Sequence, residues 1–346
     1  MLFATLLPLF AGCDKEGYGE ENNSAIGFCP AASAELKTGS AKPDDPTVLI
    51  AEGNRISIFG QRVVNEGELD ESISDIFSNE ALECVTVDNE NLNNSTWHYT
   101  PLEYWEDTGH YHFQGIFPYH ASNYTQANEL YINVLYRAGD NDDLMVARGN
   151  RIVESGGKTP VNMEFHHATS AVRFLFGKQS TVATADEFTL TDFRLNDIAV
   201  SGTLRLSTRR TTNPVEAGQD VWYPGIAGNL FSWTADRIQD RKNIPHPSVT
   251  HDPDGYLQMG WYYMIPHTLE STATVRFSIS YCGQEPMTSE LSIADRETPI
   301  GTADVWQPNQ VYNYYILITQ SGLDLTVVTT PWDEVDVNTD DMVFMP

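Results

Sequence analysis

The sequence predicts an all-β protein of two tandem sandwich-type domains, the first of which carries one short helix. The stretch Val161–Phe176 alternates apolar and polar side chains, as a half-buried strand does. Similar short runs, separated by Asn, Gly and Asp, recur along the chain and favour sandwiches over a doubly wound sheet. At 346 residues, the chain is long enough for two domains, each with its own core.

The central stretch changes its apolar positions from odd to even across His167-Ala168-Thr169-Ser170. A shift by one residue turns every following side chain to the other face, so we expect two strands, or one bulged strand, joined there. The halves on either side each have the length and strand content of one domain. We therefore predict an N-terminal domain over 25–160 and a C-terminal domain over 161–346.

Each of the following runs is predicted to be a strand, because it is rich in β-branched or aromatic residues and ends at turn residues. In the first half the expected strands are Ala25–Cys29, Arg55–Gly60, Cys84–Val87, Thr96–Tyr99, Tyr111–Pro118 and Leu130–Tyr136. In the second half they are Phe188–Leu195, Gly202–Leu206, Tyr256–Ile265, Ala273–Tyr281, Glu290–Ile293, Val311–Thr319 and Leu323–Thr329.

One segment, Glu68–Leu82, has a helical period instead. Leu69, Ile73, Ile76 and Phe77 fall at i, i+4, i+7 and i+8, and acidic residues occupy the first turn. Apolar residues at this spacing line one face of a helix, and acidic groups favour a helix N-terminus. The segment is therefore the predicted short helix.

The N-terminus resembles that of a lipoprotein precursor. Leu2–Gly12 is apolar, too short to span a membrane, and ends in small residues directly before Cys13. We predict a signal peptide over 1–12, lipidation of Cys13 and an acidic tether over 13–24. Phe10 and the lack of Lys or Arg before the apolar core depart from the usual pattern, and an N-terminal strand with a buried cysteine stays open.

Charge and cysteine usage exclude several classes. The formal charge is −28 and the pI is near 4.4, so nucleic acid and anionic lipid surfaces would repel the chain. Cys13, Cys29, Cys84 and Cys282 show neither zinc-site spacing nor the density of a disulfide scaffold. Whether the last three pair is left open.

Possible chemical sites are weak. His110 and His112 share one strand face but lack an evident third metal ligand, and the clusters Asp140–Asp143 and Asp333–Asp341 lack calcium-loop spacing. No nucleophile elbow occurs, and with 48 acidic residues any glycosidase pair would be a guess. We expect no catalytic residue, metal or cofactor. The aromatic residues considered for sugar stacking, with core packing favoured, are Trp97, Tyr104 and Trp105.

Several segments together resemble the fimbrillin family of surface pilus subunits and anchors, the Mfa-like group. The matching segments are Trp97–Pro101, Tyr104-Trp105, Tyr111–Pro118, Phe165–Phe174, Ile265-Pro266, Trp306–Tyr314 and Pro331-Trp332. The acidic segment after Cys13 likewise resembles that of surface-exported lipoproteins. The resemblance implies two transthyretin-like β-sandwich domains on a lipoprotein carried at the outer surface.

The resemblance also implies assembly by strand exchange, in which a protease removes the first strand and a neighbouring subunit fills the groove. Here the candidate removable strand is Ala25, Ile26, Gly27, Phe28 and Cys29, and the candidate processing residues are Lys37, Lys42 and Arg55. The family usually offers Arg in this loop, and Arg55 begins an expected strand, so an uncleaved anchor or tip stays open.

The candidate donor strand is the C-terminal tail Met342, Val343, Phe344 and Met345, which is as consistent with an edge strand of its own domain. The expected partners are other pilus subunits, the outer-membrane lipid through Cys13, and a host glycan or protein receptor. The predicted function is thus a non-enzymatic pilus subunit that supports adhesion. The alternatives are an uncleaved anchor or tip, a solitary glycan-binding surface lipoprotein, and a glycan hydrolase.

Overall fold

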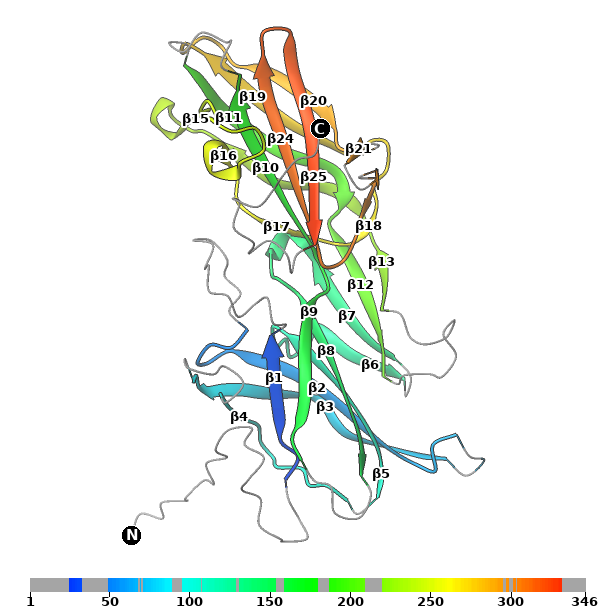
Figure 1. Ribbon diagram of the computed structural model, residues 1–346. Coiled ribbons are helices and arrows are strands. Elements are labelled where there is room, and N and C mark those ends of the chain that lie inside the picture. The colour runs from blue at the N-terminus through cyan, green and yellow to red at the C-terminus, as the bar shows by residue number, and fades with distance from the viewer. Residues whose placement is uncertain are drawn as a thin grey trace.

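The computed structural model confirms an all-β fold (Figure 1). Helical turns within the described residues are confined to the 3-10 segments Ala138–Asp140, Ile238–Asp240 and Pro253–Gly255. No helix among those residues is long and apolar enough to cross a membrane. The structure describes residues 25–32, 49–67, 69, 71–88, 95–106, 108–128, 131–153, 159–179, 187–208, 220–294, 297–298, 301–302 and 304–331.

A seven-stranded sheet forms the end of the molecule drawn at the bottom of Figure 1, in the order β1-β9-β8-β5-β2-β3-β4. Its strands are β1 (Phe28–Ala32), β2 (Arg55–Val64), β3 (Ser72–Thr86), β4 (Thr96–His98), β5 (Gly109–Phe117), β8 (Met145–Val153) and β9 (Val161–His167). Only the β1–β9 pair in this sheet is parallel. The edge strand β1 is therefore added beside a strand more than a hundred residues later in the chain.

Two further sheets face each other at the opposite end. One contains β10 (Ser170–Lys178), β16 (Leu257–Gln258), β17 (Tyr262–Met264), β24 (Gln310–Thr319) and β25 (Gly322–Pro331). The other contains β11 (Phe188–Ala199), β14 (Ala227–Thr234), β15 (Lys242–Asn243), β19 (Thr274–Tyr281) and β20 (Met287–Ser292). Phe174 and Phe176 of β10 pack against Phe193 of β11, and Phe176 also packs against Phe277 of β19. These rings form a sandwich core.

A four-stranded sheet in the middle of the molecule combines strands from both halves of the chain. It contains β6 (Tyr124–Asn128), β7 (Tyr131–Arg137), β12 (Ser201–Ser207) and β13 (Val221–Pro224). Short ladders join β18 (His267–Thr268) to β23 (Val305–Trp306) and β21 (Glu297–Thr298) to β22 (Gly301–Thr302). Strand β9 follows residue 161 but belongs to the first sheet, and β6 and β7 precede it but share a sheet with β12 and β13. The domain boundary predicted at residue 161 stays a prediction.

The joint predicted in the central stretch is confirmed. Strand β9 alternates buried and exposed residues, whereas β10 is buried along almost its whole length. Between them, Thr169 and Ser170 are buried, and the Ser170 hydroxyl donates to the carbonyl of Gln307 at 2.7 Å. The parity change therefore marks the passage of the chain from the first sheet to the second.

The predicted helix over Glu68–Leu82 is wrong. Residues Ser72–Thr86 form β3, which pairs antiparallel with β2 along its length through two register shifts. Asn79 has φ of +64°, which a right-handed helix does not allow, and its side-chain amide donates to the carbonyl of His120 at 3.0 Å. Each register shift turns the side chains that follow it to the other face of the strand. Apolar residues from both faces of β3 therefore fall in the sequence at the spacing of a helix.

Candidate functional site

The first described segment, 25–32, closes the core of the seven-stranded sheet. Strand β1 runs parallel to β9 with Phe28 opposite Val161, and the amide of Val161 donates to the carbonyl of Gly27 at 2.8 Å. Pro30 lies inside β1, which an edge strand tolerates because one side of its ladder needs no donor. The observed strand is thus shifted toward the C-terminus from the predicted Ala25–Cys29.

The opposite side of this segment contacts residues 99–104. The amide of Ile26 donates to the carbonyl of Glu103 at 2.9 Å, and Ala25 forms an antiparallel bridge with Tyr104. The Tyr99 hydroxyl donates to the carbonyl of Ile26 at 2.8 Å. Segment 25–32 is therefore held from two sides, by β9 and by the chain that follows β4.

Tyr99 keeps its proton at this contact. Burial raises the pKa of the Tyr99 hydroxyl well above its ordinary value of 10.0, and the nearby Glu103 carboxylate raises it further, while a backbone hydrogen bond at Glu103 opposes the rise. A hydroxyl whose pKa is raised in this way is neutral near pH 7 and keeps the proton that it donates. The second side of the groove thus fastens Ile26 at neutral pH.

Phe28 fills the centre of the core between these two sides. Its ring lies edge-to-face against Phe113 at 5.3 Å, Phe77 at 5.5 Å and Tyr99 at 6.0 Å between centroids. Phe28 is 7% exposed and Ile26 is 1% exposed. Apolar burial of this kind contributes about 25 cal/mol per Å². We call the cleft that segment 25–32 fills, lined by Phe77, Tyr99, Phe113, Val161 and Glu103, the β1 groove.

Other residues predicted for strand exchange are placed as follows. Arg55 is exposed at the first position of β2, opposite Glu83, and its carbonyl accepts from the amide of Tyr119 at 2.9 Å. A protease needs an extended, accessible chain, so cleavage after Arg55 would require β2 to open. The remaining candidates, Cys13, Lys37, Lys42, Met342, Val343, Phe344 and Met345, lie outside the described residues.

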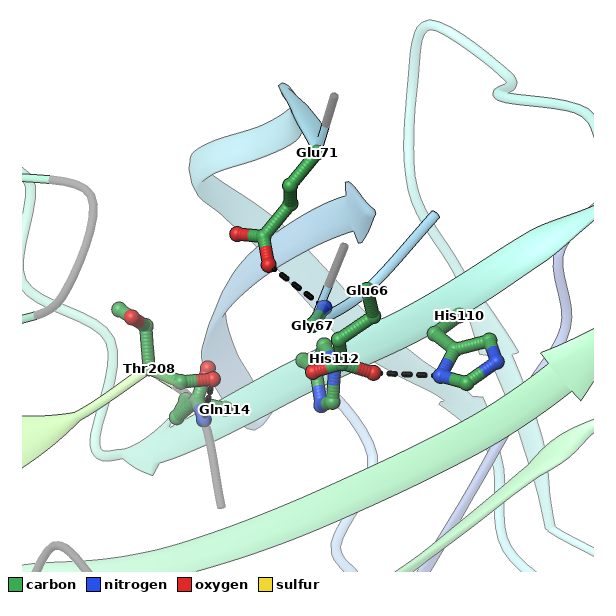
Figure 2. A network of polar contacts seen from close by, with 7 residues as sticks. All are labelled: Glu66, Gly67, Glu71, His110, His112, Gln114 and Thr208. Atoms are coloured by element: carbon green, nitrogen blue, oxygen red, sulfur yellow. Dashed lines mark hydrogen bonds and ion pairs between the residues drawn. The ribbon is translucent and has the colours of Figure 1, made fainter. Parts of the chain in front are cut away.

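The histidine pair has a partner that the sequence pattern did not indicate (Figure 2). The Glu66 carboxylate lies between the two rings, contacting Nδ1 of His110 with one oxygen and Nε2 of His112 with the other, the second at 3.0 Å. Among the described residues, no group of three or more His, Cys, Asp or Glu side chains is arranged to hold a metal ion. Glu66 instead fastens the turn after β2 to β5.

The acidic cluster Asp140–Asp143 is used within the protein. Asp143 and His167 form a buried pair at 2.9 Å, and Asp142 lies 3.5 Å from His120. The Asn141 side chain donates to the carbonyl of Trp261 at 3.0 Å and accepts from the amide of Tyr263 at 2.9 Å. These contacts join the loop before β8 to β9 and β17.

The aromatic and cysteine candidates also have clear positions. Trp97 and Trp105 are buried in the first core at 8% and 2% exposure, which confirms the core interpretation, while Tyr104 is half exposed.

Cys84 is a buried free thiol and Cys282 an exposed one, so neither pairs with Cys29.

The sequence pattern did not indicate the second side of the β1 groove, which Tyr99 and Glu103 form. The segment that holds them stands out only by its density of aromatic residues, which predicts burial without predicting what is buried against it.

The fold and the filled groove define an all-β protein whose first core is completed by an edge strand from the start of the described chain. The family model described as fimbrillin-like matches residues 32–332. The chain therefore belongs to the fimbrillin-like family, as the sequence resemblance predicted.

Solved structures agree in fold. A candidate cell adhesion protein from Bacteroides uniformis is 14% identical with a TM-score of 0.53, over 91% of this chain and 100% of that chain. A candidate cell adhesion protein from Bacteroides ovatus is 12% identical with a TM-score of 0.50, over 90% of this chain and 99% of that chain. At this identity the likeness shows the fold alone. No curated protein matches the chain.

Proposed function

We propose that this protein is a non-enzymatic fimbrial subunit that joins its neighbours by exchange of the strand in the β1 groove. The observation that supports this most strongly is the position of segment 25–32. The segment supplies core side chains and forms a ladder with β9 on one side. On its other side it forms the isolated bridge between Ala25 and Tyr104 in place of a second ladder, so it lies at the edge of the first sheet. An edge strand of this kind can be replaced by a strand from another chain without rebuilding the sheet.

Replacement requires that segment 25–32 be released. Lys37 and Lys42 lie in sequence between this segment and Leu49, where the described chain resumes. Cleavage after either lysine by a trypsin-like protease would separate segment 25–32 from β2 and the rest of the fold. We assign processing to these two lysines and not to Arg55, because Arg55 of β2 is paired with Glu83 of β3.

The cut subunit would expose the rings of Phe77, Tyr99 and Phe113, which Phe28 covers in the intact chain. An exposed apolar groove beside the unpaired edge of β9 favours capture of an extended apolar segment. The proposed donor is the tail Met342, Val343, Phe344 and Met345 of a neighbouring subunit, of the same or another type. Burial of several apolar side chains together with a ladder of hydrogen bonds would make the joint slow to open.

The surface location follows from the same proposal. Cys13 carries the lipid that holds the precursor at the outer membrane, and residues 14–24 form the tether. The net charge of −28 keeps the chain away from anionic surfaces. The assembled fimbria supports adhesion to a host glycan or protein.

The experiment that tests this proposal isolates the protein from cell-surface material, determines its mature N-terminus and examines it on a detergent gel without heating. An N-terminus after Lys37 or Lys42 together with a high-molecular-weight ladder is the expected result. An N-terminus at lipidated Cys13 with no ladder would identify an uncleaved anchor or a solitary lipoprotein and overturn the subunit proposal. The Lys37→Gln, Lys42→Gln double variant should lose the ladder, whereas Lys242→Gln, which removes a lysine from β15, should keep it.

A further inference from the structure

A cavity of about 450 Å³ lies between the seven-stranded sheet and the middle four-stranded sheet. One wall is the sheet face opposite the β1 groove. There Gln114 of β5 faces Arg148 of β8, which in turn faces Glu164 of β9. Residues directly opposite each other share a sheet face, so these polar side chains form one row, with Val146 and His166 in the next row.

The other wall comes from the second half of the chain. Leu204 and Leu206 of β12 and Trp222 of β13 line it, together with Asp220 just before β13. Arg148 forms an ion pair with Asp220 across the cavity. The walls are thus parts of two different sheets, joined by a charged pair.

The cavity has a fixed floor and an accessible mouth. Gln114 is 3% exposed, and its side-chain amide donates to the carbonyls of Ser207 at 3.1 Å and Thr208 at 2.9 Å, which links the two sheets (Figure 2). Glu164 and His166 are exposed on β9. A ligand can therefore reach the cavity from the β9 side without movement of a sheet.

Trp222 is held in place at the cavity wall. Its indole N–H donates to the carbonyl of Ala168 at 2.9 Å, and its ring meets Tyr136 edge-to-face at 5.8 Å. Because the N–H is already bonded, the ring offers the cavity mainly an apolar surface. An orienting aromatic side chain beside several polar groups is a common composition for a small-molecule site, and about 300 to 1,000 Å³ is the usual size range.

The charges select the class of ligand. Two carboxylates, Glu164 and Asp220, stand against one guanidinium, Arg148, so an anionic ligand would meet a net negative charge. A purely apolar ligand would take the Glu164 carboxylate out of water without offering it a hydrogen bond. A polyhydroxylated neutral ring satisfies both kinds of group, because each hydroxyl donates to a carboxylate or accepts from Arg148, while the C–H face packs on the indole.

We propose that the cavity bounded by Arg148, Glu164, Asp220 and Trp222 binds a neutral pyranose unit of a glycan. Glu164 accepts hydrogen bonds from two neighbouring hydroxyls at the mouth. Arg148, oriented by Asp220, donates to ring or hydroxyl oxygens, and Trp222 covers one face of the ring. The cavity lies on the sheet face opposite the β1 groove, although Glu164 is in register with Ala31 of β1.

The test uses the purified full chain and isothermal titration with glucose, galactose, mannose, fucose and N-acetylglucosamine, with sialic acid and glucuronate as anionic probes. At least one neutral sugar should bind. Glu164→Ala should weaken its binding by about tenfold or more, because charge-assisted hydrogen bonds are lost. The matched control is Glu83→Ala, which removes an exposed carboxylate from β3 of the same sheet and should leave binding unchanged.

Three results would overturn the proposal: no binding of any neutral sugar, preferential binding of the anionic probes, or equal affinity for Glu164→Ala and the parent protein. Thermal melting checks that Glu164→Ala is folded, and the conservative Glu164→Gln should fall between the parent and the alanine variant, because an amide oxygen still accepts. Binding is measured on unassembled protein, so its outcome is separate from that of the fimbrial ladder.

Discussion

Phe28 of β1 and Phe113 of β5 meet edge-to-face with 5.3 Å between their ring centroids and 85° between their planes. The two residues lie on strands that do not pair, since β1 pairs with β9 at the sheet edge. The ring of Phe28 therefore reaches over β9 and β8 to β5. A single side chain of the edge strand thus completes a core that the rest of the sheet builds.

Replacing Phe28 tests how much β1 contributes to this core. Phe28→Ala should lower the free energy of unfolding of the first sheet by about 3 to 5 kcal/mol, through lost burial and the cavity left among three rings. Denaturant unfolding measures the change. The matched control Tyr104→Ala removes a half-exposed aromatic beside the same segment and should cost under about 1 kcal/mol. Equal effects of the two variants would contradict the packing described for Phe28.

An alanine substitution at Gly60 tests how closely the rings of Phe77 and Phe113 approach the backbone of β2 in the same core. A Cβ atom at this position would lie 2.8 Å from Phe113 Cδ1 and 2.8 Å from Phe77 Cδ2. Gly60→Ala should therefore destabilise the protein by about 1 to 3 kcal/mol through overpacking. Gly139→Ala, whose Cβ would meet Leu230 at 3.5 Å, should change stability little. A neutral Gly60→Ala in thermal melting would refute this close packing.

The stability of the second core should fall on acidification because of His267. Burial lowers the pKa of His267 below its ordinary value of 6.5, although a hydrogen bond with the carbonyl of Ile265 and the nearby Glu270 carboxylate oppose this. The unfolded state then binds more protons below about pH 6.5, so the free energy of unfolding decreases as pH falls through this range. His267→Gln, which does not titrate, should lose less stability between about pH 7.5 and pH 5.5. The same loss in both proteins would exclude His267 as the cause.

The two free thiols should differ sharply in reactivity. Burial, together with the nearby Glu52 carboxylate, raises the pKa of the Cys84 thiol from 9.0 to about 11. Cys282 is exposed in the turn between β19 and β20. Iodoacetamide at about pH 8 should therefore modify Cys282 and spare Cys84 until denaturant is added, because the thiolate is the reactive form. Peptide mass mapping reads both sites, and rapid native labelling of Cys84 would contradict its burial.

The sequence predicted the strands best where β-branched, aromatic and other apolar residues dominate the run, as in β5, β10 and β24. The joint at His167–Ser170 was visible because a change of parity marks either a bulge or the end of a strand. Strand β8, Met145–Val153, was missed, since Arg148, Gly149 and Asn150 interrupt any apolar pattern. It is a strand because β5 and β9 flank it and complete its ladders, which is a long-range cause.

The candidate site was predictable to a similar extent. The apolar run from Ala25 identified the closing segment, but not Glu103 and Tyr99, which contact it after a separation of about seventy residues. Glu66 was not connected to the histidine pair for the same reason. The local sequence pattern indicates which residues are buried. Which buried surfaces contact each other depends on the register in which distant strands pair, and the sequence pattern does not give that register.

The most direct test of strand exchange locks β1 in its groove. Ala31 and Glu164 are paired across β1 and β9, and neighbouring strands lie about 4.8 Å apart, within the Cα separation that a disulfide spans. Purified Ala31→Cys, Glu164→Cys protein, oxidised and then cut with trypsin, is compared with the same protein after reduction. We expect a detergent-resistant ladder only after reduction, when segment 25–32 can leave. A ladder of equal intensity from the oxidised protein, with the bond between positions 31 and 164 verified by mass mapping, would contradict it.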